Sequence, residues 1–244
     1  MNLHITPVEH VPEIHSGTNL STCLQQAIHA SGFELQPADI LAVTQKIVSK
    51  AEGRVVDLRT VRPSPYSASI ARRMSKDGRL VEVIMRETKR IVRMRGEVLI
   101  CETHHGFICA NAGVDESNVE GEHLVTLLPE DPDKSARTLA GNLGCGVIIT
   151  DTFGRVWRDG LVDSAIGLGR VPAYIDLRGT ADAYGHRLRV TLLAAADALA
   201  AAAGLAMGKT ARTPAALIRG FQWEPDDRAA ASGLLRPVDK DLFL

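Results

Sequence analysis

The sequence has few aromatic residues and no excess of charge of either sign. Phe, Trp and Tyr make up 4% of its 244 residues, so alanine must fill many core positions. The 28 basic and 29 acidic residues give a net charge of -1, which provides no overall field that would attract nucleic acid or an anionic membrane. Any site for an anionic ligand must therefore be local.

Long hydrophobic runs and a cysteine framework are also absent. The N-terminal stretch MNLHITPVEHVPEIHSG lacks the basic and apolar segments of a signal peptide, and no later run approaches membrane-spanning length. Four cysteines in a chain of this size do not indicate a disulfide framework, and we expect free thiols, most of them in the core. These absences favour a soluble, cytoplasmic protein without a membrane partner.

Apolar periodicity and turn residues predict a mixture of helices and neighbouring strands. We expect helices over 19–33, 65–79 and 131–143, the last capped by Asp133 and closed by Gly144, and an Ala-rich helix after a strand within 187–208. We expect a strand over 39–58 that carries Lys46 and Lys50, several strands over 81–115 with reversals at Gly96 and Gly106, and an irregular span over 154–179.

This order favours the α+β class over strict βαβ repetition. We expect mixed, largely antiparallel sheets with flanking helices. No repeat, low-complexity tract or flexible linker divides residues 1–244, so we treat them as a single unit, with room for two lobes but no boundary that the sequence assigns.

Two acidic turns resemble each other. FICANAGVD and VIITDTFG each run from an apolar strand into an aspartate, Asp115 or Asp151, that small or polar residues surround. Carboxylate and hydroxyl oxygens suit hard divalent cations, so the two aspartates could share one or two ions. The alternative is that each aspartate only caps a turn.

The segment GRVWRDG follows the second acidic turn. Arg155 and Arg158 have planar donors that fit a phosphate or carboxylate, and Trp157 is available for stacking. The alternative is a solvated charged loop.

Other motifs fail on spacing or context. GNLGCG has the wrong glycine order for a dinucleotide fingerprint and reads as a helix-ending turn, and AGLAMGKT lacks the first glycine of a phosphate loop, although Lys209 could reach an anion. A zinc site in CETHHGFIC is disfavoured because adjacent histidines in a strand point to opposite faces. No Gly-x-Ser-x-Gly nucleophile elbow is present.

The segments VPEI, TQKIVSKAEGR, HHGFICANAGVDESNV, VIITDTFGRVWRDG, DSAIG, MGKT and LLRPVDKDLF occur in that order from about residue 11 onward. In these segments the chain resembles the coenzyme F-420-0 glutamate ligase family, in the form without a C-terminal flavin-binding domain. The resemblance implies the F-420 ligase-like fold and a homodimer. It also implies a GTP-dependent ligase that joins L-glutamate to the deazaflavin precursor F-420-0 through an acyl phosphate and then adds further glutamate by a γ-linkage.

The resemblance also assigns roles to particular residues. It implies Mg²⁺ or Mn²⁺, as one or two ions, and allows K⁺. The expected metal residues are Asp115, Asp151 and Thr152, and the expected GTP contacts are Val11, Pro12, Glu13, Ile14, Gln45, Lys50 and Asn118. We add the hypothesis that Arg155 and Arg158 hold the phosphodiester or carboxylate of the precursor. The chain departs from the family pattern at Val11, Gln45 and Gly204, where leucine, serine and an acidic residue occur in other members.

Two other functions fit the same residues. A metal-dependent phosphohydrolase would use the aspartate pair to release phosphate from GTP without deazaflavin or glutamate. A non-catalytic nucleotide-binding module would bind GTP and turn nothing over.

Overall fold

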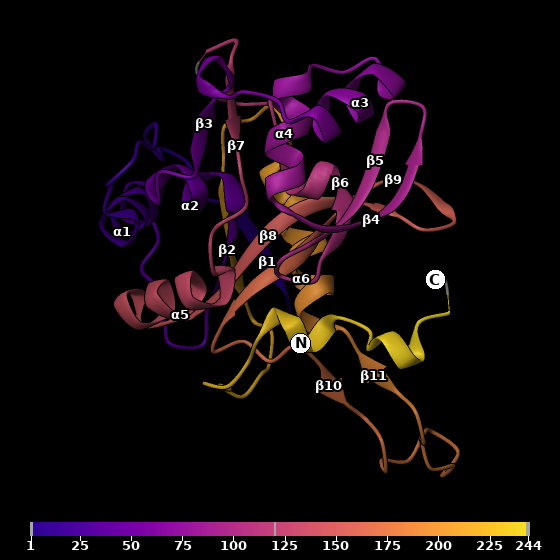
Figure 1. The fold of residues 1–244 in the computed structure, drawn as a ribbon. Helices are drawn as coiled ribbons and strands as arrows, with labels where there is room; N and C mark the ends of the chain where they lie inside the picture. The colour runs from indigo at the N-terminus through magenta and orange to yellow at the C-terminus, as the bar shows by residue number, and fades with distance from the viewer. Residues whose placement is uncertain (1, 120, 243–244) are drawn as a thin grey trace.

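The structure, a computed structural model, describes residues 2–119 and 121–242. Its main sheet has the strand order β1-β12-β2-β8-β9 (Figure 1). The strands span His4–Pro7 (β1), Ala215–Arg219 (β12), Ile40–Thr44 (β2), Gly146–Arg155 (β8) and Arg158–Gly169 (β9). Strands β2 and β8 pair in parallel and the other neighbours pair antiparallel, so the sheet is mixed.

Helices cover both faces of this sheet. The helices are α1 (Leu20–Ala30), α2 (Gln45–Ala51), α5 (Pro132–Leu143) and α6 (Ala195–Met207). On the α5 side, a side chain at Gly167 or Gly169 would meet the helix backbone at Pro132 or Ala136. Helices α1 and α2 pack beside α5, whereas α6 packs on β9 from the other side, where Gly204 abuts Asp163. Glycines therefore permit close helix contact on both faces of β9.

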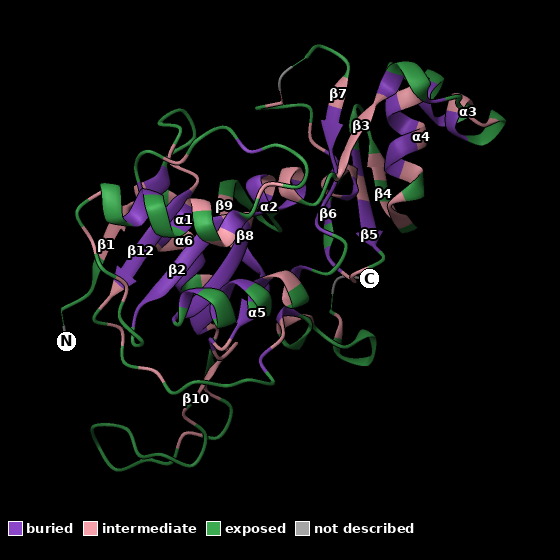
Figure 2. Cartoon of the chain, turned by 90° about the vertical axis from the view of Figure 1, so that its left-hand side faces the viewer, coloured by how far each residue is buried: buried purple, intermediate pink, exposed green. Residues whose placement is uncertain are grey.

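A second hydrophobic core lies within residues 54–127 (Figure 2). It is built by α3 (Pro65–Met74), α4 (Gly78–Arg86), the antiparallel pair β3 (Val55–Asp57) and β7 (Leu124–Thr126), and the sheet β4 (Thr88–Arg95), β5 (Val98–Thr103) and β6 (Ile108–Ala110). We call residues 54–127 the hairpin region and the remainder the sheet region. The architecture confirms the α+β class with largely antiparallel sheets and flanking helices.

The remaining elements are short. The 3-10 turns are η1 (Leu58–Thr60), η2 (Asn111–Gly113), η3 (Ala231–Leu234) and η4 (Val238–Lys240). The pair β10 (Ile175–Asp176) and β11 (Leu192–Leu193) forms the base of an arm that protrudes from the body (Figure 1). No helix in the described ranges combines the length and the apolar character that a membrane crossing needs.

Several local predictions are wrong for identifiable reasons. Strand β2 stops at Thr44, where its pairing with β8 and β12 ends, so Lys46 and Lys50 lie on helix α2 instead of on a strand. The stretch after residue 81 belongs to the strongly amphipathic helix α4, capped by Asp77. Residues 158–169 form strand β9 because they pair along the length of β8.

The cap of α5 also differs from the prediction. Asp131 caps the helix by accepting a hydrogen bond from the Lys134 N–H at 2.9 Å. Asp133 instead accepts from the backbone N–H groups of Leu168 and Ala231, at 2.8 and 2.9 Å, and so ties α5 to β9 and to the C-terminal segment. The predicted end at Gly144 is confirmed, since this residue adopts the left-handed conformation with φ of 73°.

Candidate active site

The predicted site residues converge on one end of the main sheet. The last pair of the parallel strands β2 and β8 is Thr44 with Thr150. Gln45 and Asp151 are therefore the first residues beyond this pair, at the same end of the sheet. Strand β12 begins beside this end, because its Ala215 pairs with Val43. Strand β1 ends there as well. Ligands commonly bind where the carboxyl ends of neighbouring parallel strands meet, because loops diverge there.

The hairpin region contributes Asp115 to this end of the sheet. The Nζ atom of Lys46 donates to the Asp115 carboxylate at 2.5 Å, and to the carbonyl and hydroxyl oxygens of Ser117 at 2.6 and 2.9 Å. Asp115 itself is fixed by two backbone hydrogen bonds with Thr126. Burial opposes ionisation of Asp115, but the bonds from Lys46 and Ser117 outweigh it and lower its pKa. Lys46 thus links the two regions through an ionised aspartate.

Asp151 experiences a different environment. Burial, together with the nearby carboxylates of Asp115 and Asp163, raises the pKa of Asp151 to about 7, although the Thr152 N–H and Lys46 act in the opposite direction. Strands β6 and β8 contact each other here, and the Asp151 charge also contributes to the raised pKa of the buried Cys109 thiol. Asp151 is therefore a half-buried carboxylate whose charge its protein neighbours do not compensate.

Thr152 and Asp163 form a neighbouring group on the other face of the sheet. They are cross-strand partners, and the Thr152 hydroxyl donates to the Asp163 carboxylate at 2.5 Å. Lys209 donates to both side chains, with its Nζ 3.1 Å from Asp163. A Cβ atom at Gly204 would lie 2.4 Å from the Asp163 carboxylate, so the glycine leaves room for it. Because successive residues of a strand point to opposite faces, Asp151 and Thr152 do not share one side.

These groups fit a divalent cation in their chemistry. Among the described residues, no three His, Cys, Asp or Glu side chains are grouped closely enough to hold a metal ion by themselves. Mg²⁺ commonly takes one or two carboxylates and completes its shell with water and phosphate oxygens, so such a protein cage is not required. The uncompensated charge of Asp151, with Asp115 beside it, suits such an ion. Thr152 and Asp163 offer hard oxygen donors on the adjacent face.

The residues expected to contact GTP differ in how accessible their side chains are. Lys50 forms an ion pair with Glu13, which joins α2 to the segment that follows β1. The Ile14 side chain is buried, so this residue can reach a ligand only through its backbone, whereas Val11 is half-buried and packs against the core. Pro12 is exposed.

Gln45 and Asn118 differ from each other in accessibility. The Gln45 side chain is 2% exposed, and its carbonyl oxygen accepts from the Ser49 hydroxyl at 2.8 Å. Asn118 is exposed and adopts a positive φ of 52° in the turn after Asp115. Asn118 is therefore available to a ligand as the structure stands, whereas the Gln45 side chain would have to exchange a hydrogen bond.

Arg155 and Arg158 lie at the far end of the β8–β9 hairpin. They pair across it and are exposed, and Arg155 donates to the Asp159 carbonyl oxygen. Arg155 lies four positions after Asp151, which corresponds to about 13 Å along an extended strand. The two arginines can therefore serve a long ligand, and not the atoms held directly between Asp115 and Asp151.

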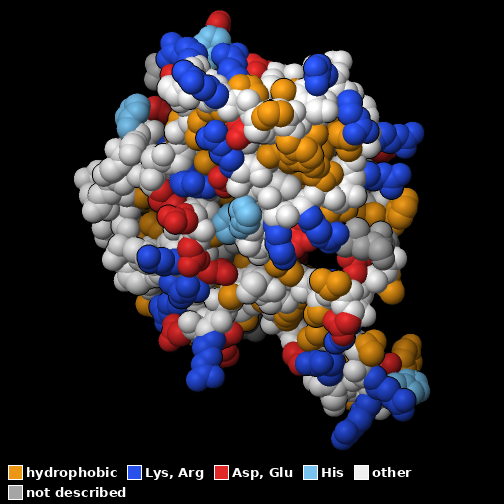
Figure 3. All heavy atoms as spheres, in the orientation of Figure 1, with side chains coloured by type: hydrophobic (Ala, Val, Ile, Leu, Met, Phe, Trp, Pro, Cys, Tyr) orange, Lys and Arg blue, Asp and Glu red, His pale blue; other side chains and the backbone are white. Residues whose placement is uncertain are grey.

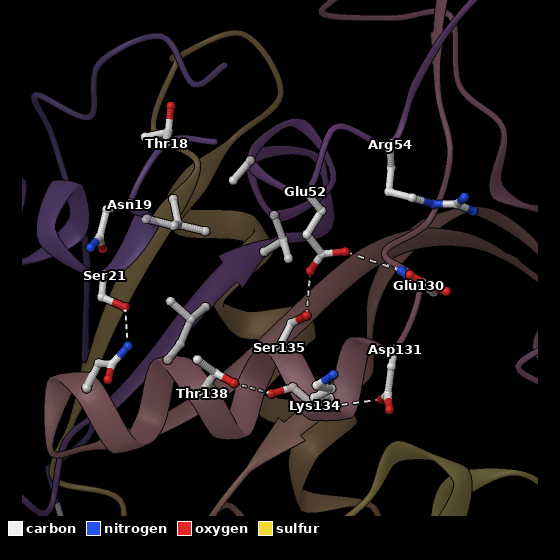
Figure 4. A pocket seen from close by; sticks show the side chains of 15 residues that line it. Thr18, Asn19, Ser21, Glu52, Arg54, Glu130, Asp131, Lys134, Ser135 and Thr138 are labelled. Carbon is white, nitrogen blue, oxygen red and sulfur yellow. Dashed lines mark hydrogen bonds between the residues drawn. The ribbon is translucent and has the colours of Figure 1, made fainter. Parts of the chain in front are cut away.

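Two cavities lie near these elements. The larger, about 750 Å³, is lined by α1, α2, α5 and the segments beside them, including Asn19, Glu52, Arg54 and Lys134 (Figure 4). None of the predicted site residues lines it, because Lys46 and Lys50 occupy another face of α2. The smaller cavity, about 170 Å³, is lined by Phe107, Phe153, Ser164 and Asp197 among others and adjoins the acidic end of β8.

Sequence reasoning did not assign functional roles to Lys46 or Asp163, and it placed Ser117 only in a turn capped by Asp115, a contact that the structure shows. Asp163 belongs to the DSAIG segment, and it gains a role because strand pairing places it opposite Thr152. Lys46 precedes Lys50 by one helical turn, a spacing that would have signalled a shared face if α2 had been predicted as a helix.

Carboxylates, a hydroxyl and lysines are gathered at the carboxyl ends of two parallel strands, an arrangement whose chemistry suits an enzyme acting on anionic ligands with a divalent cation. The sequence model of the F420-0:Gamma-glutamyl ligase family matches residues 9–220, and the chain belongs to this family.

Proteins named Coenzyme F420:L-glutamate ligase are similar to this chain over nearly its whole length. The one from Methanothermobacter thermautotrophicus is 41% identical, with 100% of this chain and 99% of the relative aligned. The one from Methanopyrus kandleri is also 41% identical, over 99% and 97% of the two chains. The one from Methanocaldococcus jannaschii is 36% identical, over 92% and 90%.

Proposed function

We propose that this protein joins L-glutamate to the deazaflavin precursor F-420-0 in a GTP-dependent reaction. Family membership and the names of the full-length relatives support the substrates. The observation that carries the proposal is the meeting of Asp115, Asp151 and Lys46 at the ends of β2 and β8. Transfer of a phosphoryl group between two anions needs such a combination of metal-binding carboxylates and fixed cations.

The proposed reaction has two steps. An oxygen of the precursor carboxylate attacks the γ-phosphorus of GTP, and GDP leaves with the bridging oxygen. The amino group of L-glutamate then attacks the acyl carbon, loses a proton, and displaces inorganic phosphate. A later γ-linked addition repeats both steps on the side-chain carboxylate of the added glutamate.

The protein groups have distinct tasks in this scheme. Asp115 and Asp151 would hold Mg²⁺ or Mn²⁺, with Thr152 as an oxygen ligand for a second ion on the other face of the sheet. When bound, the divalent ion supplies neutralisation of the phosphate oxygens. Lys46 and Lys209 place positive charge on the two faces of the same strand end. The proposed activity also includes a monovalent K⁺ ion, so K⁺ is added to the assay buffer.

The nucleotide and the precursor would occupy different parts of the site. We assign GTP to the side where Glu13 and Lys50 pair and where Asn118 is exposed, with backbone contacts from Val11 to Ile14 and a contact from Gln45. Arg155 and Arg158 would hold the phosphodiester or carboxylate of the precursor, because a guanidinium can bind such groups through two parallel hydrogen bonds.

A homodimer is part of the proposal, and the arm gives it a candidate contact surface. Tyr184 and Val190 on this arm are 88% and 86% exposed, and Leu192 and Leu193 at its base are also exposed. Figure 3 shows apolar side chains among charged ones on the protruding arm. Apolar side chains displayed on a projecting segment are typical of an association surface.

One incubation tests the activity. Purified protein is mixed with F-420-0, L-glutamate, GTP, Mg²⁺ or Mn²⁺ and K⁺, and products are followed by mass spectrometry. Glutamyl mass increments support the ligase, and successive increments give the tail length. Release of GDP without glutamylated product would favour a metal-dependent phosphohydrolase, and GTP binding without turnover would favour a non-catalytic module.

A further inference from the structure

The β8–β9 hairpin extends beyond the main sheet. Strand β2 accompanies β8 only as far as Thr150, whereas β8 continues to Arg155 and turns into β9 (Figure 1). Asp151 is therefore the first residue of a two-stranded projection. The smaller cavity lies at the root of this projection, between Phe107 and Phe153.

The tip of the hairpin displays a tryptophan in an unfavourable conformation. Trp157 has a positive φ of 63° and is 82% exposed. A bulky residue in this region of φ is a genuine outlier, and glycine would be accommodated there without strain. A large and mostly exposed aromatic side chain thus occupies a backbone conformation that glycine would adopt without strain, and such outliers cluster at functional sites.

The groups along the projection follow a definite order. Asp151, Phe153 and Arg155 alternate along β8 and lie on one face of it, because the extra residues at the register shift near the tip belong to β9. From Asp151 to the tip, the hairpin therefore presents a carboxylate for a metal ion, the Phe153 ring, the Arg155 guanidinium and finally the indole of Trp157. The distance from Asp151 to Arg155 along the strand is about 13 Å. The turn that carries Trp157 follows Arg155 directly.

We propose that Trp157 is the stacking platform for the deazaflavin ring of the precursor and that the β8–β9 hairpin holds the precursor lengthwise. This inference rests on the proposed function. In the precursor the reacting carboxylate, the phosphodiester and the flat aromatic ring follow one another along one chain, which matches the order of Asp151, Arg155 and Trp157. The occupant is assigned on charge, since Arg155 and Arg158 lie on either side of Trp157 in the sequence and complement a phosphodiester anion, and on continuity of the hairpin with the acidic end of β8.

The first measurement uses the fluorescence of Trp157. The chain has two tryptophans, and Trp223 packs beside the core with its indole N–H donating to the Ala38 carbonyl at 3.0 Å. In a Trp223→Phe background, F-420-0 alone is titrated without GTP or L-glutamate. Stacking of the deazaflavin on the indole is expected to quench Trp157 emission in a saturable way.

The second measurement is steady-state kinetics of Trp157→Gly, a change that the backbone conformation tolerates. The KM for F-420-0 is expected to rise about 2- to 12-fold, the range that one stacked aromatic pair supplies. The kcat and the KM for L-glutamate should stay unchanged, and Trp157→Phe should recover part of the loss. Val156→Ala, which trims a 63% exposed apolar side chain at the same turn, is the matched control and should leave the KM unaltered.

The outcomes separate this inference from the proposed function. If the wild-type protein forms no glutamylated product, the proposed function fails first. If it forms product but Trp157→Gly leaves the KM for F-420-0 unchanged and the titration leaves the emission unaltered, only the stacking role is overturned. The stacking role is also overturned if Trp157 emission follows protein concentration instead of F-420-0, with Trp157→Gly shifting sedimentation toward a smaller species, because the ring would then serve a second copy of the chain.

Discussion

Asp115 and Asp151 follow similar stretches of sequence but reach opposite electrostatic states. Asp115, in the turn after β6, is bound by Lys46 and Ser117, which lower its pKa. Asp151, just past the part of β8 that pairs with β2, is half-buried beside other carboxylates, and its pKa is raised to about 7. The difference indicates that one aspartate is already neutralised by the protein, whereas the other lacks a cation that a metal ion would supply.

The largest expected effect is on turnover. Asp115→Asn and Asp151→Asn should each lower kcat/KM for glutamate incorporation by about 10²- to 10³-fold, since each removes a ligand of the ion that is proposed to neutralise the transferring phosphoryl group. The rate of product formation, followed by mass spectrometry, measures this fall in kcat/KM. A variant that kept wild-type activity would show that its aspartate holds no ion that the reaction needs.

The next effect concerns stabilisation by metal. Mn²⁺ at about 100 times its dissociation constant should stabilise the wild-type protein by about 2.7 kcal/mol, because it binds the folded state alone. Thermal unfolding with and without Mn²⁺ measures the gain, with no nucleotide present. Both asparagine variants should lose most of this gain, and a full gain in either would remove that aspartate from the metal site.

In metal-free protein the two variants should move stability in opposite directions, by about 1 kcal/mol each. Asp151→Asn should stabilise, because it removes a half-buried charge that lacks compensation. Asp115→Asn should destabilise, because it weakens the contact that links Lys46 to the hairpin region. Denaturant unfolding in the presence of a chelator measures both changes. Equal shifts of the same sign would contradict the contrast between the two environments.

The smallest effect tests competition between Lys46 and the metal. Lys46→Met should tighten Mn²⁺ binding about 2- to 5-fold, because it removes an ammonium group that contacts Asp115, a gain on the scale of one exposed ion pair. Calorimetric titration with the metal alone measures it. Lys50→Met is the control, since Lys50 pairs with Glu13 instead of Asp115. Weaker binding in Lys46→Met would show that Lys46 positions the aspartate rather than competing for it.

The pairing of elements explains which predictions from sequence failed. The run that contains Lys46 was expected to be one strand, but strand pairing ends at Thr44, and no local pattern reveals where partners end. The side chains of Lys46 and Asp115 are 69 residues apart in sequence, so their contact depends on how the two regions pack. The same holds for Asp163, whose partner Thr152 is set by cross-strand register.

The sequence by itself determined the α+β class, the helix-ending turn at Gly144 and the two acidic turns, because these depend on local periodicity, turn chemistry and short motifs. Its resemblance to a known family also named the family that the full-length comparison establishes. The tertiary structure alone decided that Lys46 neutralises Asp115 while Asp151 stays uncompensated, and that Thr152 faces Asp163 on the other side of the sheet. Those outcomes follow from burial and from distances between residues remote in sequence, and both are properties of the packed chain.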